Sequence, residues 1–110
     1  MAFDPDLARR VREALATQGA FEEKRMFGGV AFMRRGNMVC GVLGESLILR
    51  LGEEGAARAV ADRGVALFAG AGRPMRTMVQ VPAEKLGTSE DLVRWLDAAV
   101  AFTETLPAKS

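Results

Sequence analysis

The sequence predicts an α+β fold, a two-layer sandwich in which helices cover one side of an antiparallel sheet. Short apolar stretches separated by glycine turns follow one another between residues 24 and 51, which is typical of an antiparallel meander. Amphipathic helical patterns precede this block, follow it and end the chain. The expected order is therefore a helix, three or four strands, a helix, one or two strands and a last helix. The length suits a single domain spanning residues 1–110.

The first helix has a clear start signal. Asp4 can cap it, Pro5 stands where a missing N–H costs nothing, and Asp6 suits the positive end of the helix dipole. Apolar residues then follow at helical spacing along one stripe: Leu7, Val11, Ala14 and Leu15. Gly19 fits a position just beyond the last turn.

Four strands are expected next, with turns marked by glycine. Their predicted ranges are 24–27, 30–33, 38–43 and 46–51. The pair Gly28-Gly29 either bends the first hairpin or cradles a ligand, and the residues leave both open. Residues 35–37 and the pair Gly44-Glu45 have turn composition.

The second half of the chain alternates helix and strand. A helix is predicted over residues 53–62, with Gly64 just past its end. Short strands are predicted over 65–68 and 77–81, and residues 70–74 between them read as a loop. The last helix is expected to start near Ser89, capped by Ser89 or Thr88, and to end at Pro107.

The composition argues against an enzyme. The chain has no histidine and no tyrosine, so it lacks the commonest general base and the commonest transition-metal ligand. Its single cysteine, Cys40, lies in a predicted strand and is expected to be a buried, inert thiol. Adjacent carboxylates such as Glu22-Glu23 and Glu53-Glu54 point apart instead of converging. We therefore expect no catalytic residue, no cofactor and no metal site.

Four arginines form a candidate anion-binding patch. They flank the predicted hairpin turn and the glycine-rich loop: Arg34, Arg35, Arg73 and Arg76. The loop itself fails the dinucleotide and P-loop patterns, because a strand rather than a helix follows Gly72. The alternative is that these arginines face water or pair with acids. Met75 and Met78 near the same loop either fill the core or line a groove for a partner.

Several partner classes are not expected. A net charge of +1 and few aromatics near the basic residues argue against direct nucleic-acid binding by this chain. No apolar run approaches the roughly 20 residues of a membrane-spanning helix. The absence of a leader pattern and the single cysteine favour a cytoplasmic location.

The order of motifs resembles the N-terminal domain of the TfoX/Sxy family over essentially the whole chain. The most specific matches are MFGG at 26–29, the Gly36-Asn37 turn, GRPM at 72–75 and Trp95. The resemblance implies an α+β fold similar to that of type III secretion chaperones, able to dimerise. Full-length members regulate natural competence genes through protein contacts with the cyclic-AMP receptor protein, and carry a second, helical domain that we do not expect here.

We therefore expect a stand-alone, non-enzymatic protein-interaction module related to competence and transcription co-regulators. Its expected partner is a protein, with the transcription machinery as one candidate, and a homodimer is also expected. The alternative hypothesis is a domain that binds a small anionic ligand or nucleotide through Arg34, Arg35, Arg73 and Arg76. That alternative requires the four side chains to converge.

Overall fold

A computed structural model describes residues 3–26, 28–70 and 72–108 and confirms the α+β class. The six strands form one antiparallel sheet in the order β1-β2-β3-β4-β6-β5. The helices are α1 (Pro5–Ala16), α2 (Gly52–Arg63) and α3 (Ser89–Thr103), with a short 3-10 helix at Ala83–Lys85. The strands are β1 (Glu22–Met26), β2 (Gly29–Arg34), β3 (Asn37–Leu43), β4 (Ser46–Arg50), β5 (Ala66–Gly70) and β6 (Arg73–Val81).

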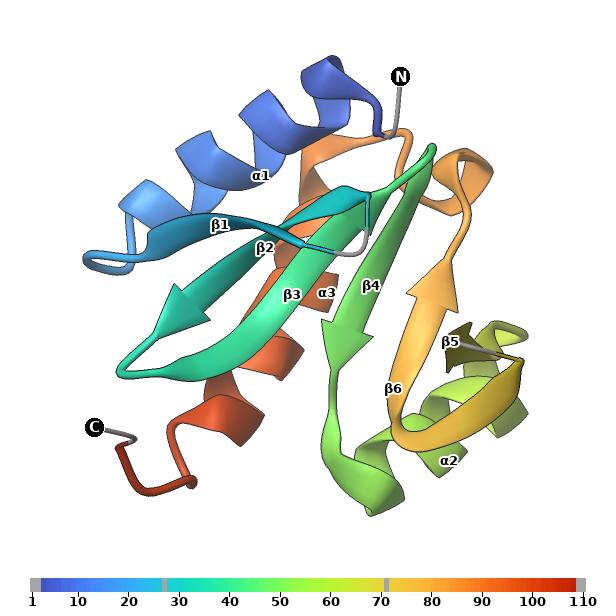
Figure 1. The fold of residues 1–110 in the computed structure, drawn as a ribbon. Helices are drawn as coiled ribbons and strands as arrows, with labels where there is room; N and C mark the ends of the chain where they lie inside the picture. The colour runs from blue at the N-terminus through green and yellow to red at the C-terminus, as the bar shows by residue number, and fades with distance from the viewer. Residues whose placement is uncertain (1–2, 27, 71, 109–110) are drawn as a thin grey trace.

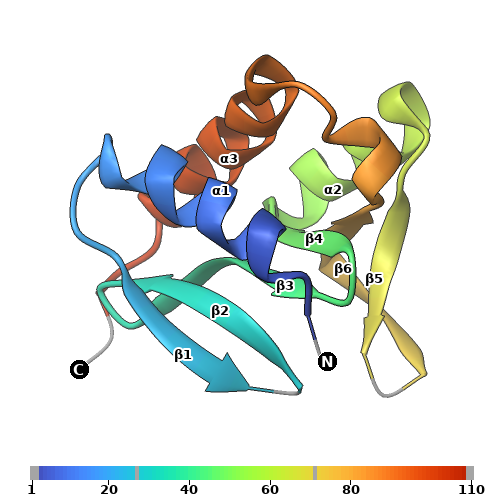
Figure 2. The same cartoon turned by 90° about the horizontal axis from the view of Figure 1, so that it is seen from above.

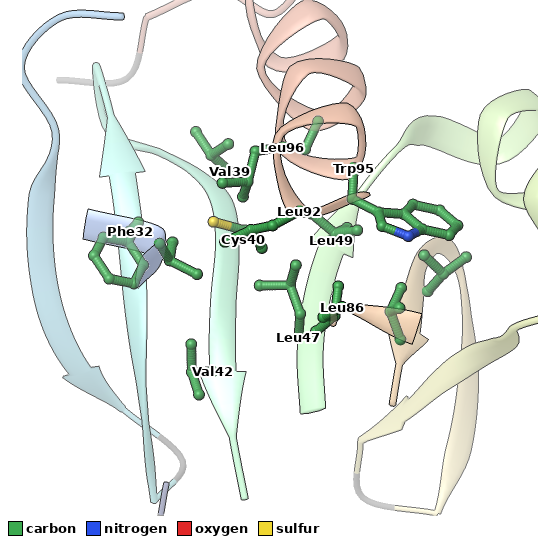
Figure 3. Packing of buried hydrophobic residues seen from close by; sticks show 14 of the residues in the cluster. Phe32, Val39, Cys40, Val42, Leu47, Leu49, Leu86, Leu92, Trp95 and Leu96 are labelled. Carbon is green, nitrogen blue, oxygen red and sulfur yellow. The ribbon is translucent and has the colours of Figure 1, made fainter. Parts of the chain in front are cut away.

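All three helices pack on one face of the sheet, as predicted (Figures 1 and 2). Between the two layers lies the main core, to which both the helices and the strands contribute. Figure 3 shows side chains of β2, β3 and β4 meeting those of α3, with Trp95 at the end nearest α2. Trp95 and Phe32 are almost fully buried, and burial of such large side chains is the main source of stability in this kind of fold. No helix in the described ranges is long and apolar enough to cross a bilayer.

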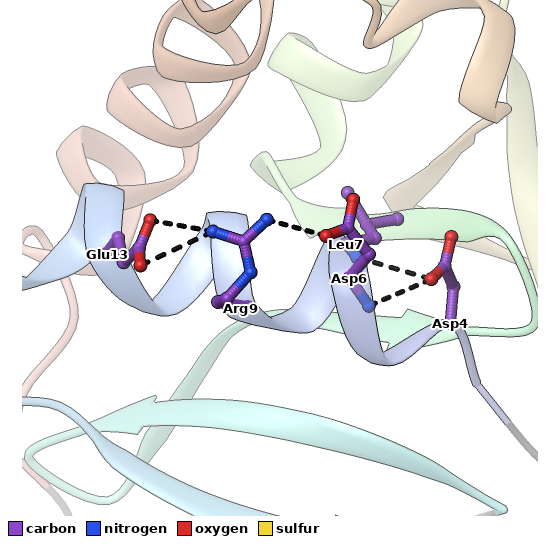
Figure 4. A network of polar contacts seen from close by, with 5 residues as sticks. All are labelled: Asp4, Asp6, Leu7, Arg9 and Glu13. Carbon is purple, nitrogen blue, oxygen red and sulfur yellow. Dashed lines mark hydrogen bonds and ion pairs between the residues drawn. The ribbon is translucent and has the colours of Figure 1, made fainter.

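Both well-signalled helix starts form as expected. The Asp4 carboxylate accepts hydrogen bonds from the backbone N–H groups of Asp6 (2.9 Å) and Leu7 (3.4 Å) (Figure 4). Arg9 then donates to Asp6 at 2.5 Å and to Glu13 at 3.3 Å along the exposed side of α1. At α3 the N-cap is Thr88, whose hydroxyl accepts from the N–H of Asp91.

The hairpin between β2 and β3 explains several features of the sequence. Its two turn residues, Arg35 (φ 52°) and Gly36 (φ 81°), both have positive φ, as a tight type I′ connection requires. Farther along, Phe32 pairs with Cys40 whereas Met33 pairs with Met38, so β3 carries one extra residue. This bulge allows Val39 and Cys40 both to be buried in the main core.

Gly29 lies in β2 where the backbone of β3 comes very close. A Cβ at this position would stand 2.3 Å from the carbonyl oxygen of Val42. The glycine is therefore required by strand packing, which favours the bending interpretation of Gly28-Gly29 over a ligand cradle. Phe27, the predicted end of the preceding strand, lies outside the described residues.

The prediction of a loop over residues 70–74 is wrong, because most of these residues belong to strands. β5 runs to Gly70 and β6 begins at Arg73, and these two residues pair directly. The segment is thus a β-hairpin, and β6 is four residues longer than the predicted strand at 77–81. The glycine and proline content indicates a loop, but Pro74 is the second residue of β6, and proline is tolerated near the start of a strand. The remaining boundaries differ from the predictions by a few residues at most.

Candidate functional site

Arg34 and Arg35 lie at the β2–β3 turn and hold the end of the chain in place. The Arg34 guanidinium is 3.2 Å from the Glu104 carboxylate, donates to the backbone oxygen of Gln18 at 3.3 Å, and lies 5.0 Å from the centre of the Phe21 ring. Arg35 approaches Glu104 at 4.0 Å. These contacts tie the α1–β1 connection and the end of α3 to the hairpin, which is a structural role.

Asn37 adds a buried contact to the same corner. Its side chain is only 3% exposed, and its amide nitrogen donates to the carbonyl oxygen of Pro107 at 3.0 Å. Asn37 is one of two buried polar residues in the described ranges, together with Thr103. Sequence reasoning treated Asn37 only as a turn former, because nothing local indicates that its partner is seventy residues away.

Arg73 and Arg76 lie at the other side of the molecule. Both are exposed and belong to the first half of β6. In the sheet, β4 separates β6 from β3 and so from the β2–β3 turn, and both views show β6 on the far side of β4 from that turn (Figures 1 and 2). The structure therefore does not bring the four predicted arginines together, and it offers no single anion patch at these positions.

The face of the sheet opposite the helices carries a second apolar cluster. Its buried members come from three neighbouring strands, and we call them, with two partly buried neighbours, the open-face cluster: Ile48, Phe68, Met78, Met38 and Leu43. Figure 1 views this face directly, with α3 behind the sheet and no helix in front of it. The cluster is separate from the main core, and all its described members belong to strands of the sheet.

Met75 extends the open-face cluster into solvent. A Cβ on Gly70 would lie 3.2 Å from the Phe68 ring and 3.9 Å from the Met75 sulfur, so these two side chains flank the same point. Met75 is 41% exposed, one of three large apolar side chains exposed in the described ranges. Met78 is buried in the open-face cluster, whereas Met75 is exposed.

Positive charge accompanies this surface. Arg50 follows Ile48 by two residues on β4, so strand alternation places it on the open face. Arg76 directly follows Met75 on β6. Arg50 pairs with Met78 across the two strands. The described residues include no acidic ion-pair partner within 4.0 Å of Arg50, Arg73 or Arg76.

The ionisable groups elsewhere have structural surroundings. Cys40 is fully buried, and burial raises the pKa of its thiol, which disfavours the reactive thiolate. A hydrogen bond from Arg12 lowers the pKa of Glu23, and one from Arg9 lowers the pKa of Asp6. In the described ranges, His, Cys, Asp and Glu side chains form no group of three or more that could hold a metal ion.

Comparison with known families gives one clear result. The family model of the TfoX N-terminal domain matches residues 13–103, which is most of the chain. The matched part begins within α1 and ends with α3, so it covers the whole sheet and both clusters. No curated protein matches the chain.

Proposed function

Because the chain belongs to the TfoX N-terminal domain family, we propose that it is a non-enzymatic protein-interaction module related to competence and transcription co-regulators. The observation that supports this proposal best is the open-face cluster with its exposed extension at Met75. A sheet face that carries apolar side chains and has no helix over it is a surface on which a protein partner can pack.

The chemistry of this surface defines the partner. Methionine is flexible and polarisable, so Met38, Met75 and Met78 can adapt to the shape of an incoming segment. Arg50, which pairs with Met78 across β4 and β6, adds positive charge to this face, and arginine is enriched in protein interfaces. The partner we propose is therefore a cytoplasmic protein segment that presents apolar side chains flanked by carboxylates, with the transcription machinery as its candidate source.

The non-enzymatic part of the proposal rests on where the ionisable groups lie. Asp6 and Glu23 are engaged in ion pairs on the surface of α1 and β1, and Cys40 is sealed in the core. None of these groups lines the open face. A surface that acts by contact needs no titrating group, and that is the kind of surface this chain offers.

A second copy of the chain is the other occupant that we consider for the open face. Homodimerisation through it would bury Met75 symmetrically in an isologous contact. Size-exclusion chromatography with light scattering at high micromolar concentration tests this directly. A monomeric mass there would exclude the homodimer and leave the heterologous partner as the proposal.

A pair of matched variants tests the interaction surface. Met75→Glu places a negative charge on the open face, and Val93→Glu places one at an equally exposed apolar position on α3 (41% and 40% exposed). A protein captured from native lysate by the wild type should be purified and its binding measured by calorimetry. We expect Met75→Glu to weaken binding roughly tenfold or more and Val93→Glu to leave it unchanged. Equal affinities for the wild type and Met75→Glu, both being folded, would refute the assignment of this face.

A further inference from the structure

A groove on the helical side of the molecule has the construction of a small-ligand site. It lies between α2 and α3 and has a volume of about 320 Å³. Its apolar wall is formed by Leu51, Gly55, Ala59 and Ala98 together with the buried Trp95. Its charged lining residues are Arg58, Asp62 and Arg63, which together carry one net positive charge. Volumes of this order are typical of small-molecule sites. The groove lies on the side of the sheet opposite the open-face cluster.

Arg63, in the last turn of α2, is the charged residue of this groove that contacts Trp95. Its guanidinium carbon lies 3.7 Å from the centre of the Trp95 ring, which is a close stacking contact. Within the described ranges, no hydrogen bond reaches the Arg63 side chain and no carboxylate lies within 4.0 Å of it. One face of the guanidinium is therefore held by the indole while its N–H groups remain available to a ligand.

The surrounding charges indicate which anion fits. Arg58 also lines the groove and is only loosely paired with Glu54, at 3.8 Å. An adjoining cavity shares Asp62, Arg63 and Trp95 with the groove and is also lined by Lys85 and Asp91. The two aspartates oppose a multiply charged anion such as phosphate, whereas a single negative charge matches one free guanidinium. A carboxylate also matches the planar fork of arginine geometrically.

We propose that the α2–α3 groove binds a small organic carboxylate. Its carboxylate group accepts two N–H bonds from Arg63, and its apolar body lies against Leu51, Ala59 and Ala98. Stacking on Trp95 fixes the guanidinium before the ligand arrives, which reduces the entropy lost on binding. This site is independent of the proposed protein-interaction surface and would hold or fail without it.

The chain supplies its own reporter for this site, since Trp95 is its only tryptophan. We would titrate the protein with hexanoate and follow Trp95 emission and backbone amide shifts by NMR. Hexanamide is the uncharged control of the same shape, and inorganic phosphate at equal ionic strength tests the anion class. We expect a saturable response to hexanoate with an affinity of about millimolar, given the size of the ligand. The shifted amides should cluster in α2 and α3.

Three variants complete the test. Arg63→Ala should weaken hexanoate binding roughly tenfold or more, and Arg63→Lys should recover only part of it, because lysine lacks the bidentate fork. Arg73→Ala removes an exposed arginine on β6 and should change nothing. NMR provides a readout that does not depend on the altered stacking of Trp95 in the Arg63 variants. The proposal is overturned if hexanoate gives no saturable response, if hexanamide or phosphate binds equally well, or if Arg63→Ala binds as the wild type does.

Discussion

Replacing Gly29 with alanine is the sharpest test of how β2 and β3 pack. Gly29 is buried and its φ is not in the left-handed region, so alanine meets no backbone strain there. The added Cβ would lie 2.3 Å from the Val42 carbonyl oxygen and 3.3 Å from the Val42 carbonyl carbon. Both neighbours are backbone atoms of β3 and cannot swing away as a flexible side chain could. The two strands must separate locally to admit one methyl group.

The size of the effect follows from this geometry. Overpacking a well-packed interior typically costs about 1–3 kcal/mol, and a clash with backbone belongs at the upper end, so we expect a loss of about 3 kcal/mol. At about 2.1 cal/mol/K of unfolding entropy per residue, a chain of this length loses roughly 4 °C in melting temperature for each kcal/mol. The variant should therefore melt about 13 °C below the wild type.

Gly87 provides the matched control. A Cβ there would meet nothing within 4 Å, and Gly87 is not among the glycines with positive φ. Gly87→Ala should melt within about 2 °C of the wild type or slightly above it, since alanine reduces the entropy of the unfolded chain. Thermal unfolding of both variants by circular dichroism makes the comparison. If Gly29→Ala and Gly87→Ala have the same melting temperature, the close approach of β2 to β3 does not restrict the size of the side chain at position 29.

Two further predictions concern polar contacts. Asn37→Ala leaves the Pro107 carbonyl without its buried donor, so the free energy of unfolding measured in urea should fall by about 1–3 kcal/mol. The Leu106 amide hydrogen should also exchange faster with solvent. Unchanged exchange would show that Asn37 does not fix the end of the chain. Arg12→Ala should raise the pKa of Glu23, because the hydrogen bond from Arg12 lowers it in the native protein. The stability that this lowered pKa supplies is present above the pKa of an ordinary glutamate and is lost as pH falls through the lowered value. The wild type should thus be more stable than Arg12→Ala at neutral pH, and the two stabilities should converge in acid. A stability difference that stays constant from neutral to acid pH would contradict this assignment. So would an NMR titration in which the pKa of Glu23 is the same in both proteins.

The parts of the fold that sequence predicted well depend on local chemistry. Asp4 and Pro5 mark the start of α1 because capping and the fixed φ of proline act within one turn. The turn at residues 35–36 and the left-handed Gly64 after α2 follow from the same kind of short-range requirement. Alternation of apolar residues in β4 correctly indicated a sheet with one face in the main core.

The parts that sequence missed depend on contacts between distant segments. The length of β6 is set by its pairing with β4 and β5, which overrides the glycine and proline signals around Pro74. The four arginines looked equivalent in sequence, but the β2–β3 and β5–β6 turns lie on opposite sides. Arg63 could not be singled out at all, because its importance comes from Trp95 on another helix.

The two surfaces proposed for function differ in how they are built, and this difference separates their tests. The open face relies on flexible methionines over a sheet, so a charge at Met75 should disturb contact with a protein while leaving the main core intact. The α2–α3 groove relies on one guanidinium fixed by stacking, so its affinity should depend on the geometry of Arg63 as well as on its charge. Because the sheet separates the two surfaces, Met75→Glu should leave hexanoate binding unchanged and Arg63→Ala should leave the protein partner bound. If either variant affected both activities, the two surfaces would be coupled through the core, and the assignment of independent sites would fall.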